Sequence, residues 1–468
     1  MTDALWSFDD LVAAAGGSAD GAATKLIGGF SLDSRGISLG EVFVALKDQR
    51  DGHEFVASAF ANGAAAALVS RDYARKSGDG ALIRVGDTLR GLENIGRAAR
   101  ARLAPDARVI AVTGSAGKTG TKEMLRACLA RLGPTHAADK SFNNHWGVPL
   151  TLVRMPAATR YGVFEIGMNH AGEITPLSQM VQPHVAIITT VEAVHLEQFA
   201  SVAEIAEAKA EILAGVVPGG VAVLNRDNVH YDLLARRAGE RGVRVVSFGL
   251  HAEADVRCVD VTLGADGSKV TARLAGRDVI YDVAVPGAHI VQNSLAVLAA
   301  IHEAGADAGK AIAALADMQA PAGRGTRTQL SVPGGPILLI DESYNANPAS
   351  MRAALSVLGT VPRAQYSRRI AVLGDMLELG GEAAALHAGL KEAVDAAGAD
   401  LVFACGPHML HLFAALPDGR QGAWAAQSSG IADALLDTVA AGDAVMIKGS
   451  NGSRMAPLVA AMKAKFAG

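Results

Sequence analysis

The chain has 468 residues, of which 50% are hydrophobic and 19% are charged, and its formal net charge is −4 at pH 7. This length allows for about three domains with sizeable cores. A weakly acidic chain offers no basic surface to nucleic acids or anionic membranes, so an anionic ligand must be held by a local site. The N-terminus, MTDALWSFDD, lacks the basic start and long apolar core of a secretion signal, and the apolar runs are too short to span a bilayer. We therefore expect a cytoplasmic protein.

Residues 1–106 predict a small mixed α/β domain. Its polar motifs stand at the ends of short strand-like runs, where ligand groups are usually received. They are Asp33-Ser34-Arg35 and Asp51-Gly52-His53, with Lys47 at the end of the apolar run between them. Each motif is a weak signal by itself, because Asp-Gly is also a common turn sequence.

The clearest motif begins with the apolar run Val109 to Thr113, which leads through a glycine turn to Lys118 and Thr119. These two residues open a segment whose apolar side chains recur with a helical period. A strand, a glycine turn and a helix N-terminus form a cradle in which backbone N–H groups meet phosphate oxygens. Lys118 can reach the outer phosphates, and the Thr119 hydroxyl can bind magnesium.

This loop, Gly-x-x-Gly-Lys-Thr, is two residues shorter than a Walker A loop, because Val112 stands where that motif has glycine. A glycine turn without a ligand is the alternative, but the flanking strand and helix favour an anion site. The motif predicts a site for a nucleoside triphosphate.

Residues 107–323 alternate strand-like runs with helical stretches, which predicts a parallel sheet covered by helices. Ligands of such sheets gather at the carboxyl ends of the strands. Glu165 stands at such an end, in YGVFEIGM, and His195 follows the run VAIITTV. A buried carboxylate must be paired or bound to a cation, so Glu165 is predicted to bind magnesium, with a structural ion pair as the alternative. Alternating residues from 255 to 285 predict an antiparallel β excursion, after which Asn293 is predicted to open a helix.

Lys209 lies four residues after Ile205 and three before Ile212, on the apolar face of a predicted helix that begins at the capping box Ser201 to Glu204. A lysine in such a place usually extends to water along its stem. Alternatively its amine is deprotonated and reacts with carbon dioxide, and the resulting carbamate binds a second magnesium. The spacing alone favours the first interpretation.

Three cysteines, Cys128, Cys258 and Cys405, stand far apart in apolar segments, which predicts reduced buried thiols. His408 and His411 are three residues apart without an acidic companion, which favours a surface pair over a metal site. The polar stretch FNNHWGVP predicts a loop.

Residues 324–468, which follow the glycine- and arginine-rich linker AGRGTRTQL, predict a second doubly wound sheet. Its strand-like runs end in polar motifs but include no glycine cradle. The predicted fold class is therefore α/β, with a small N-terminal domain (1–106), a central P-loop-type ATPase domain with a β excursion (107–323) and a C-terminal Rossmann-like domain (324–468).

Placed in order, these motifs resemble the Mur ligase superfamily of ATP-consuming, amide-forming enzymes over the whole chain. The motifs that carry the resemblance are TGSAGKT, SFNNHWGVPLTL, EIGMNHAGEI, HLEQF with AEAKAEI, DESYNANPASM, GDMLELG and KGSNGSRM. DESYNANP and EIGMNHAGEI are similar to the members that join D-alanyl-D-alanine to a UDP-N-acetylmuramoyl-tripeptide. The Asp-Asn-Pro-Arg motif of the sister ligases that add the third residue is not found in the sequence.

The resemblance implies roles for the matching positions. The residues implied to bind ATP are Gly114, Ser115, Ala116, Gly117, Lys118, Thr119, Gly120, Asn293, Arg324, Asp341 and Tyr344. The residues implied to bind the UDP substrate are Ser34, Arg35, Lys47, Asp51, His53, Asn143 and Asn144. Two magnesium ions are expected, and their implied ligands are Thr119, Glu165, His195 and a carbamylated Lys209. The implied catalytic residues are Lys118, Glu165, His195 and Lys209. Gly120, Gly325-Thr326 and Asn451 depart from the usual residues of the family.

The implied reaction transfers the γ-phosphoryl group of ATP to the tripeptide carboxylate, and the dipeptide amine then attacks the acyl phosphate. The product would be UDP-N-acetylmuramoyl-pentapeptide, a peptidoglycan precursor, with ADP and phosphate. Closure of the third domain is expected to hinge near Gly323 to Gly325. The expected partners are small molecules, without nucleic acid or membrane insertion, and the expected enzyme is a monomer of the bacterial cytoplasm.

Two alternatives remain at this stage. A ligase similar to folylpolyglutamate synthase would share the second and third domains but would not need the N-terminal motifs. A nucleotide-binding switch would hold ATP without needing Glu165, His195 and Lys209.

Overall fold

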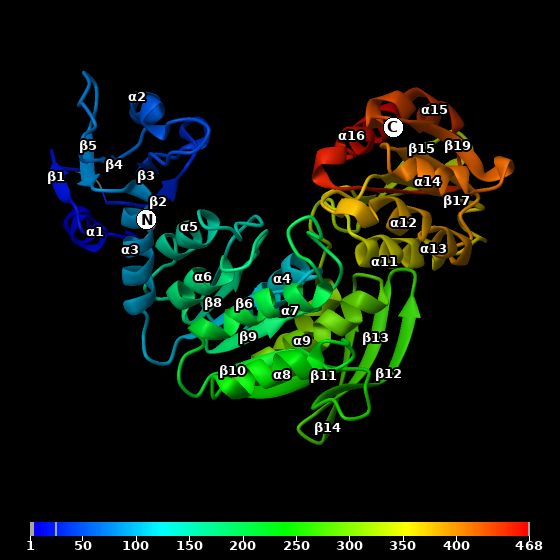
Figure 1. Cartoon of the computed structure of the whole chain (residues 1–468), viewed down its shortest axis with the longest axis horizontal. Helices are drawn as coiled ribbons and strands as arrows, with labels where there is room; N and C mark the ends of the chain where they lie inside the picture. The colour runs from blue at the N-terminus through cyan, green and yellow to red at the C-terminus, as the bar shows by residue number, and fades with distance from the viewer. Residues whose placement is uncertain (1–3, 24–25, 467–468) are drawn as a thin grey trace.

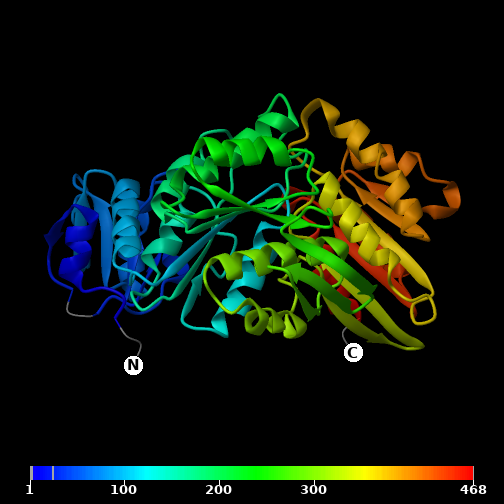
Figure 2. The same ribbon diagram turned by 90° about the horizontal axis from the view of Figure 1, so that it is seen from below.

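The computed structural model describes residues 4–23 and 26–466. The chain forms three lobes in sequence order, each built on its own sheet (Figure 1). Seen from below, the lobes lie in a row with the central lobe between the other two (Figure 2). The predicted three-domain α/β class is thereby confirmed. Among the described residues, no helix combines the length and the apolar character that a membrane span requires.

The N-terminal lobe has a five-stranded sheet in the order β1-β5-β4-β3-β2, parallel except where β1 meets β5. Its strands are β1 (Ser18–Asp20), β2 (Gly29–Ser31), β3 (Glu41–Val44), β4 (Ala66–Ser70) and β5 (Ala81–Val85). Its helices are α1 (Phe8–Ala15), α2 (Val56–Ala61) and α3 (Thr88–Ala101).

This lobe shares its core with the central lobe. Leu150 and Val153, from α5 (Gly147–Val153), are buried in the apolar cluster of the N-terminal sheet. Trp6 Nε1 donates a 3.1 Å hydrogen bond to the carbonyl of Val153, and the Arg102 guanidinium lies 3.8 Å from the centre of the Trp6 ring. Because apolar packing and hydrogen bonds both cross the boundary, the first two lobes are firmly joined.

The central sheet has nine strands in the order β14-β13-β12-β11-β10-β9-β6-β8-β7. Its parallel strands are β6 (Arg108–Thr113), β7 (Thr135–Ala137), β8 (Tyr161–Glu165), β9 (Val185–Ile188), β10 (Val221–Asn225) and β11 (Arg244–Gly249). Its further helices are α4 (Lys118–Ala130), α6 (Ile174–Val181), α7 (Val202–Ala210), α8 (Tyr231–Glu240), α9 (Ala288–Glu303) and α10 (Ala308–Ile312). Alternate residues of β6 enter the two cores: Ile110 and Val112 pack toward α4 and α9, and Val109 and Ala111 pack toward α5 to α8.

The β excursion is present as β12 (Val256–Gly264), β13 (Gly267–Leu274) and β14 (Arg277–Val283). It extends the parallel sheet, because Phe248 of β11 pairs in parallel with Val256 of β12. The following helix does not begin at Asn293, as the sequence pattern predicted. It begins at Ala288, because Gly287, with φ at 124°, ends the extended segment and caps α9. Asn293 therefore lies inside the helix.

The C-terminal sheet has the order β15-β16-β20-β17-β18-β19 and is parallel except for the pairing of β15 with β16. Its strands are β15 (Thr326–Val332), β16 (Gly335–Glu342), β17 (Arg368–Gly374), β18 (Leu401–Cys405), β19 (Gln421–Ala425) and β20 (Asp443–Lys448). Its helices are α11 (Pro348–Gly359), α12 (Ala383–Ala388), α13 (Lys391–Ala396), α14 (Met409–Ala414), α15 (Ala432–Thr438) and α16 (Ala456–Phe466). The sequence pattern missed the edge strands β15 and β19, because polar and half-exposed residues interrupt their apolar pattern.

The cysteines are all free thiols, as predicted. Cys128 and Cys405 are buried, but the prediction was wrong for Cys258, which is half-buried in β12. Strand β12 lies outside the parallel core of the central sheet, so one face of it stays near solvent.

Candidate active site

The phosphate cradle has the predicted strand–turn–helix form, with β6 ending at Thr113 and α4 beginning at Lys118. Gly114 and Gly117 adopt φ angles of 146° and 83°. A Cβ atom at Gly114 would lie 1.9 Å from Thr189 Oγ1, and one at Gly117 would lie 2.7 Å from Asn293 Nδ2. Both positions therefore need glycine, for conformation and for space.

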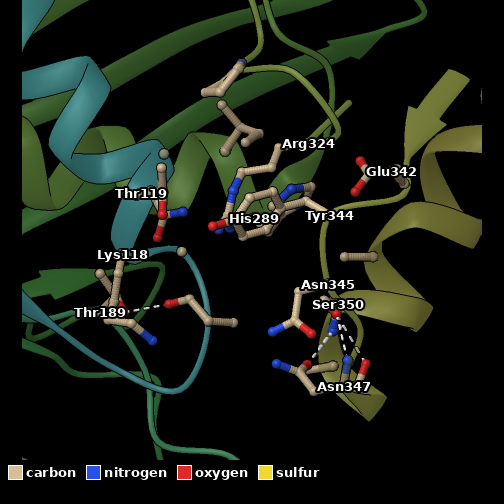
Figure 3. Close-up of a pocket in the computed structure, with 18 of the residues that line it drawn as sticks. Lys118, Thr119, Thr189, His289, Arg324, Glu342, Tyr344, Asn345, Asn347 and Ser350 are labelled. Carbon is tan, nitrogen blue, oxygen red and sulfur yellow. Dashed lines mark hydrogen bonds between the residues drawn. The ribbon is translucent and has the colours of Figure 1, made fainter. Parts of the chain in front are cut away.

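A cavity of about 420 Å³ lies over this cradle, between the central and C-terminal lobes. Figure 3 shows the cradle on one side of the cavity and the loop after β16 on the other. Nine of the eleven predicted ATP-binding residues, all except Gly114 and Asp341, line it together: Ser115, Ala116, Gly117, Lys118, Thr119, Gly120, Asn293, Arg324 and Tyr344. The tertiary fold thus unites residues that are far apart in the sequence.

Lys118 Nζ donates a 2.6 Å hydrogen bond to the carbonyl of Gly114, within its own loop. Burial lowers the pKa of Lys118, and the neighbouring Arg324 lowers it further while Glu165 opposes the shift. A buried cation favours an anionic ligand, because the ligand replaces the charge stabilisation that water provides elsewhere.

Glu165 lies beside the first turn of α4. Its Oε2 accepts a 2.9 Å hydrogen bond from the Thr119 hydroxyl, and its Oε1 accepts a 2.6 Å bond from the Asn143 amide. The Ser141 hydroxyl lies 3.1 Å from that of Thr119. A carboxylate beside two hydroxyl groups suits magnesium, which prefers hard oxygen ligands.

His195 and Lys209 also lie near Lys118, whose charge lowers the pKa of both. Lys209 is 2% exposed, and burial, together with the charge of Lys118, lowers its pKa well below the ordinary value. His195 Nδ1 lies 2.5 Å from Oε2 of Glu378 in the C-terminal lobe. Both partners of this pair have left-handed backbones, with φ at 54° and 63°. Strain of this kind persists only where the surrounding structure holds it.

Within residues 4–23 and 26–466, no three or more histidine, cysteine or acidic side chains come together as a ready metal site. Glu165 and His195 therefore do not form a metal centre by themselves.

The predicted ATP-binding residues of the C-terminal lobe do not all face the cavity. The guanidinium of Arg324 stacks 4.1 Å from the ring centre of Tyr344. Asp341 points elsewhere: its Oδ1 accepts hydrogen bonds of 3.0 and 2.6 Å from the backbone N–H and hydroxyl of Ser343. The adjacent Glu342 lines the cavity instead, where it lies 3.3 Å from Lys448 Nζ.

The predicted UDP-binding residues lie mostly in the N-terminal lobe. Asp51 Oδ1 is 2.6 Å from His53 Nδ1, and its Oδ2 is 3.3 Å from Lys47 Nζ. Burial opposes ionisation of Asp51, but hydrogen bonds from His53 and Lys47 lower its pKa to about 2. Ser34 is buried, whereas Arg35 is exposed and forms a 2.7 Å ion pair with Asp33.

The two asparagines of FNNHWGVP form hydrogen bonds with different partners. Asn143 turns to Glu165, as described above, and lines the ATP-side cavity. Asn144 Oδ1 instead accepts hydrogen bonds from the backbone N–H groups of Trp146 and Gly147 at the start of α5. The stretch is therefore a loop only up to that point, since α5 begins at Gly147.

Several cavity-lining residues received no role from the sequence. They are Glu192, His289, Glu342, Asn345, Asn347 and Lys448. Four of them belong to DESYNANP and KGSNGSRM, which begin in the last residues of β16 and β20. Their position at the carboxyl end of a strand was the signal that could have identified them. His289 had no such signal, because it lies in the first turn of α9.

The family model described as Mur ligase middle domain matches residues 112–301, and the model described as Mur ligase, glutamate ligase domain matches residues 323–451. A UDP-N-acetylmuramoyl-tripeptide–D-alanyl-D-alanine ligase of Escherichia coli is 38% identical over 80% of this chain and 80% of its own length. The chain belongs to the Mur ligase family. The recognition made from the motifs is thereby confirmed.

Other relatives support the same family assignment. The ligase of the same name from Bacillus subtilis is 32% identical over 93% of each chain. The crystal structure of MurF from Acinetobacter baumannii superimposes with a TM-score of 0.84 and 30% identity, covering 97% of this chain and 98% of that one. A folylpolyglutamate synthase/dihydrofolate synthase, the alternative considered from the sequence, gives a TM-score of 0.57 at 17% identity, so it shares the fold alone.

Proposed function

We propose that this Mur ligase joins D-alanyl-D-alanine to a UDP-N-acetylmuramoyl-tripeptide at the expense of ATP. The observation that carries the proposal is the cavity between the lobes, where Lys118 and Thr119 of the cradle face Arg324 of the C-terminal lobe. The relatives of that name, which match 80% or more of this chain, support the choice of substrates.

In the first step, the carboxylate of the tripeptide attacks the γ-phosphorus of ATP, and the bond from that phosphorus to the bridging oxygen of ADP breaks. Lys118 and the N–H groups of the glycine turn stabilise charge on the transferred phosphoryl group. Thr119 and Glu165 would hold a magnesium ion, which offsets phosphate charge when it is bound. Arg324 and Tyr344 would close over the nucleotide from the other lobe.

In the second step, the dipeptide amine attacks the acyl phosphate carbonyl, phosphate leaves with its oxygen, and the nitrogen loses a proton. Water would hydrolyse the same intermediate, so the lobes must exclude it. The proposed hinge lies at Gly323 and Gly325, which have φ angles of 71° and 100°. Rotation there would move Arg324 and the C-terminal lobe together.

Lys209 is proposed to carry a carbamate. Support comes from its burial and its lowered pKa, since a neutral amine is the form that reacts with carbon dioxide. Together with Glu165 and His195 it would hold a second magnesium ion.

The cluster of Lys47, Asp51 and His53, with Ser34 and Arg35, is proposed to receive the UDP end of the tripeptide. Because the reaction consumes ATP, we propose that the enzyme works in the cytoplasm.

Phosphate release from ATP tests the proposal, with UDP-N-acetylmuramoyl-tripeptides and a panel of acceptors. We expect release only when both tripeptide and D-alanyl-D-alanine are present, with the pentapeptide as product by mass spectrometry. Release with a folate substrate and glutamate would instead favour the folylpolyglutamate activity. Binding of ATP without acceptor-dependent release would favour a nucleotide switch.

A further inference from the structure

One lysine of the central lobe is completely enclosed by protein. Lys122 lies in the second turn of α4, and its exposed fraction is 0%. Lysine is almost never buried to this extent unless it is paired, because other groups must replace the water around its charge. The nearby residues Met124 and Leu125 fill the core without any charge. Packing alone therefore does not explain the lysine.

The three N–H groups of this ammonium each have an acceptor within the protein. Nζ donates a 2.5 Å hydrogen bond to the carbonyl of Ala138 and a 3.4 Å hydrogen bond to the carbonyl of Lys140. Oε1 of Glu123 lies 2.7 Å from the same Nζ and balances its charge. A lysine ammonium has three donors and no acceptor, so its capacity is filled. Lys122 also lines neither of the two cavities described for this part of the molecule.

Both carbonyls belong to the segment of residues 138–143, which follows the edge strand β7 and forms neither helix nor strand. The Lys140 carbonyl also accepts a 2.8 Å hydrogen bond from the N–H of Phe142, so the segment turns tightly at this point. Buried backbone carbonyls outside regular structure need donors from side chains or water. Lys122 supplies these donors and attaches the start of the segment to α4.

The far end of this segment contacts the residues that are proposed to hold magnesium. Ser141 Oγ lies 3.1 Å from Oγ1 of Thr119 and 3.4 Å from Nη2 of Arg324. Figure 3 shows Arg324 extending toward Thr119. The Asn143 amide donates its 2.6 Å hydrogen bond to Glu165. The segment therefore connects the buried ammonium to the magnesium side of the nucleotide cavity.

Helix α4 contacts this segment at both of its ends. Lys122 and Thr119 lie three positions apart, which places them on neighbouring parts of one helix face. Lys122 binds the backbone of the segment, and Thr119 meets the side chain of Ser141. Groups that orient metal ligands without touching the metal typically change metal affinity by about 10–100-fold when they are removed.

We propose that Lys122 is a positioning residue for the binding of the magnesium–nucleotide complex. Its ammonium holds the segment 138–143 in place, so that Ser141 and Asn143 orient Thr119 and Glu165. Lys122 itself touches neither the nucleotide nor the metal. The inference rests on the proposed function, because it concerns the magnesium that Thr119 and Glu165 are proposed to hold there.

The test compares Lys122→Met with Lys140→Met by calorimetry, using β,γ-imido-ATP, which is not hydrolysed, once with magnesium and once with EDTA. Methionine keeps an unbranched stem but has no N–H donor. Lys140 is exposed on the same segment, and its carbonyl remains in the control variant. The affinity with magnesium divided by the affinity with EDTA is called the magnesium gain. We expect Lys122→Met to reduce this gain by about tenfold and to change the affinity with EDTA by less than about threefold. Lys140→Met should leave both affinities unchanged.

A double-mutant cycle shows whether Lys122 acts through the segment. The variant Ser141→Ala/Asn143→Ala removes both contacts at the far end and should also lower the magnesium gain. Adding Lys122→Met to it should lower the gain by less than about threefold more, because the connection to the metal is already broken. If circular dichroism shows that Lys122→Met does not fold, Lys122→Gln takes its place in both experiments. Glutamine stays polar, but its side chain is too short by one atom to reach the same carbonyls.

An unchanged magnesium gain, equal losses of affinity with magnesium and with EDTA, or additive losses in the cycle would overturn the positioning role of Lys122. Wild-type enzyme that binds the analogue with magnesium but releases no phosphate from ATP with tripeptide and D-alanyl-D-alanine would instead overturn the proposed function. The two failures are distinguishable, because the binding test needs neither the tripeptide nor the dipeptide.

Discussion

The Thr119 hydroxyl donates a 2.9 Å hydrogen bond to Oε2 of Glu165, and this bond joins the first turn of α4 to the end of β8. Forty-six positions separate the two residues in the chain. They meet because β6, which leads into α4, pairs in parallel with β8, so that Val112 lies beside Glu165. A phosphate loop and a carboxylate become one site through the register of two neighbouring strands.

Replacing Lys118 by alanine should reduce kcat for ligation by about 10²–10³-fold, because the transferred phosphoryl group loses a preorganised cation. Arg126→Ala removes a charge from the exposed side of the same helix and serves as the control. Phosphate release measures both, and circular dichroism checks the fold. Near-normal ligation by Lys118→Ala would exclude the cradle as the ATP site.

Lys209→Ala should be inactive in ligation, and short carboxylates such as acetate should restore part of the activity. The buried amine would be carbamylated in the wild-type enzyme, and a small carboxylate can replace the carbamate in the space that alanine leaves. Enzyme labelled with ¹³C-bicarbonate should show a carbamate carbon signal that the variant lacks. Absence of both the rescue and the signal would contradict the carbamate.

Tyr344→Ala should raise the KM for ATP by about tenfold, whereas Tyr344→Phe should stay close to wild type. The ring holds the Arg324 guanidinium at 4.1 Å, and phenylalanine preserves that stacking without the hydroxyl. Initial rates at varied ATP separate the two variants. A large effect of the phenylalanine variant would mean that the hydroxyl, rather than the stacking, contributes to binding.

The stability of the protein should fall as the pH drops from about 6.5 toward 4, in part through His184. Burial, with Arg100 and Arg108 nearby, lowers the pKa of His184 to about 4, and its Nδ1 accepts a 3.0 Å hydrogen bond from the Val109 N–H. Above pH 6.5 the residue is neutral in both states. Below that pH the unfolded chain binds a proton that the folded state disfavours, so unfolding becomes easier.

Allowing for the partial exposure of His184, its contribution should be about 1–2 kcal/mol of the free energy of unfolding. Urea denaturation at pH 7 and at pH 5 measures it. The free energy of unfolding of His184→Gln should change less between these two pH values than that of the wild type. His302→Gln, in the last turn of α9, serves as the control. Equal sensitivity of wild type and His184→Gln would refute the assignment.

The local sequence pattern was sufficient to predict the structure where the signal lies within one segment. The run from β6 into α4 combines a continuous apolar strand, two glycines at positive φ and an amphipathic helix, and all three depend on neighbouring residues alone. The edge strand β15 carried no such signal. Its pairing with β16 satisfies its backbone, and that pairing is a tertiary property.

The sequence by itself therefore determined the three sheets, the phosphate cradle and the family, because these follow from periodicity and from motifs of contiguous residues. Tertiary structure decided which side chains meet: it turned Asn143 to Glu165, left Asp341 with Ser343, and brought Glu378 to His195 across the two lobes. Such contacts depend on strand register and on the packing of separate lobes, and a linear pattern does not encode the distance between residues on different lobes.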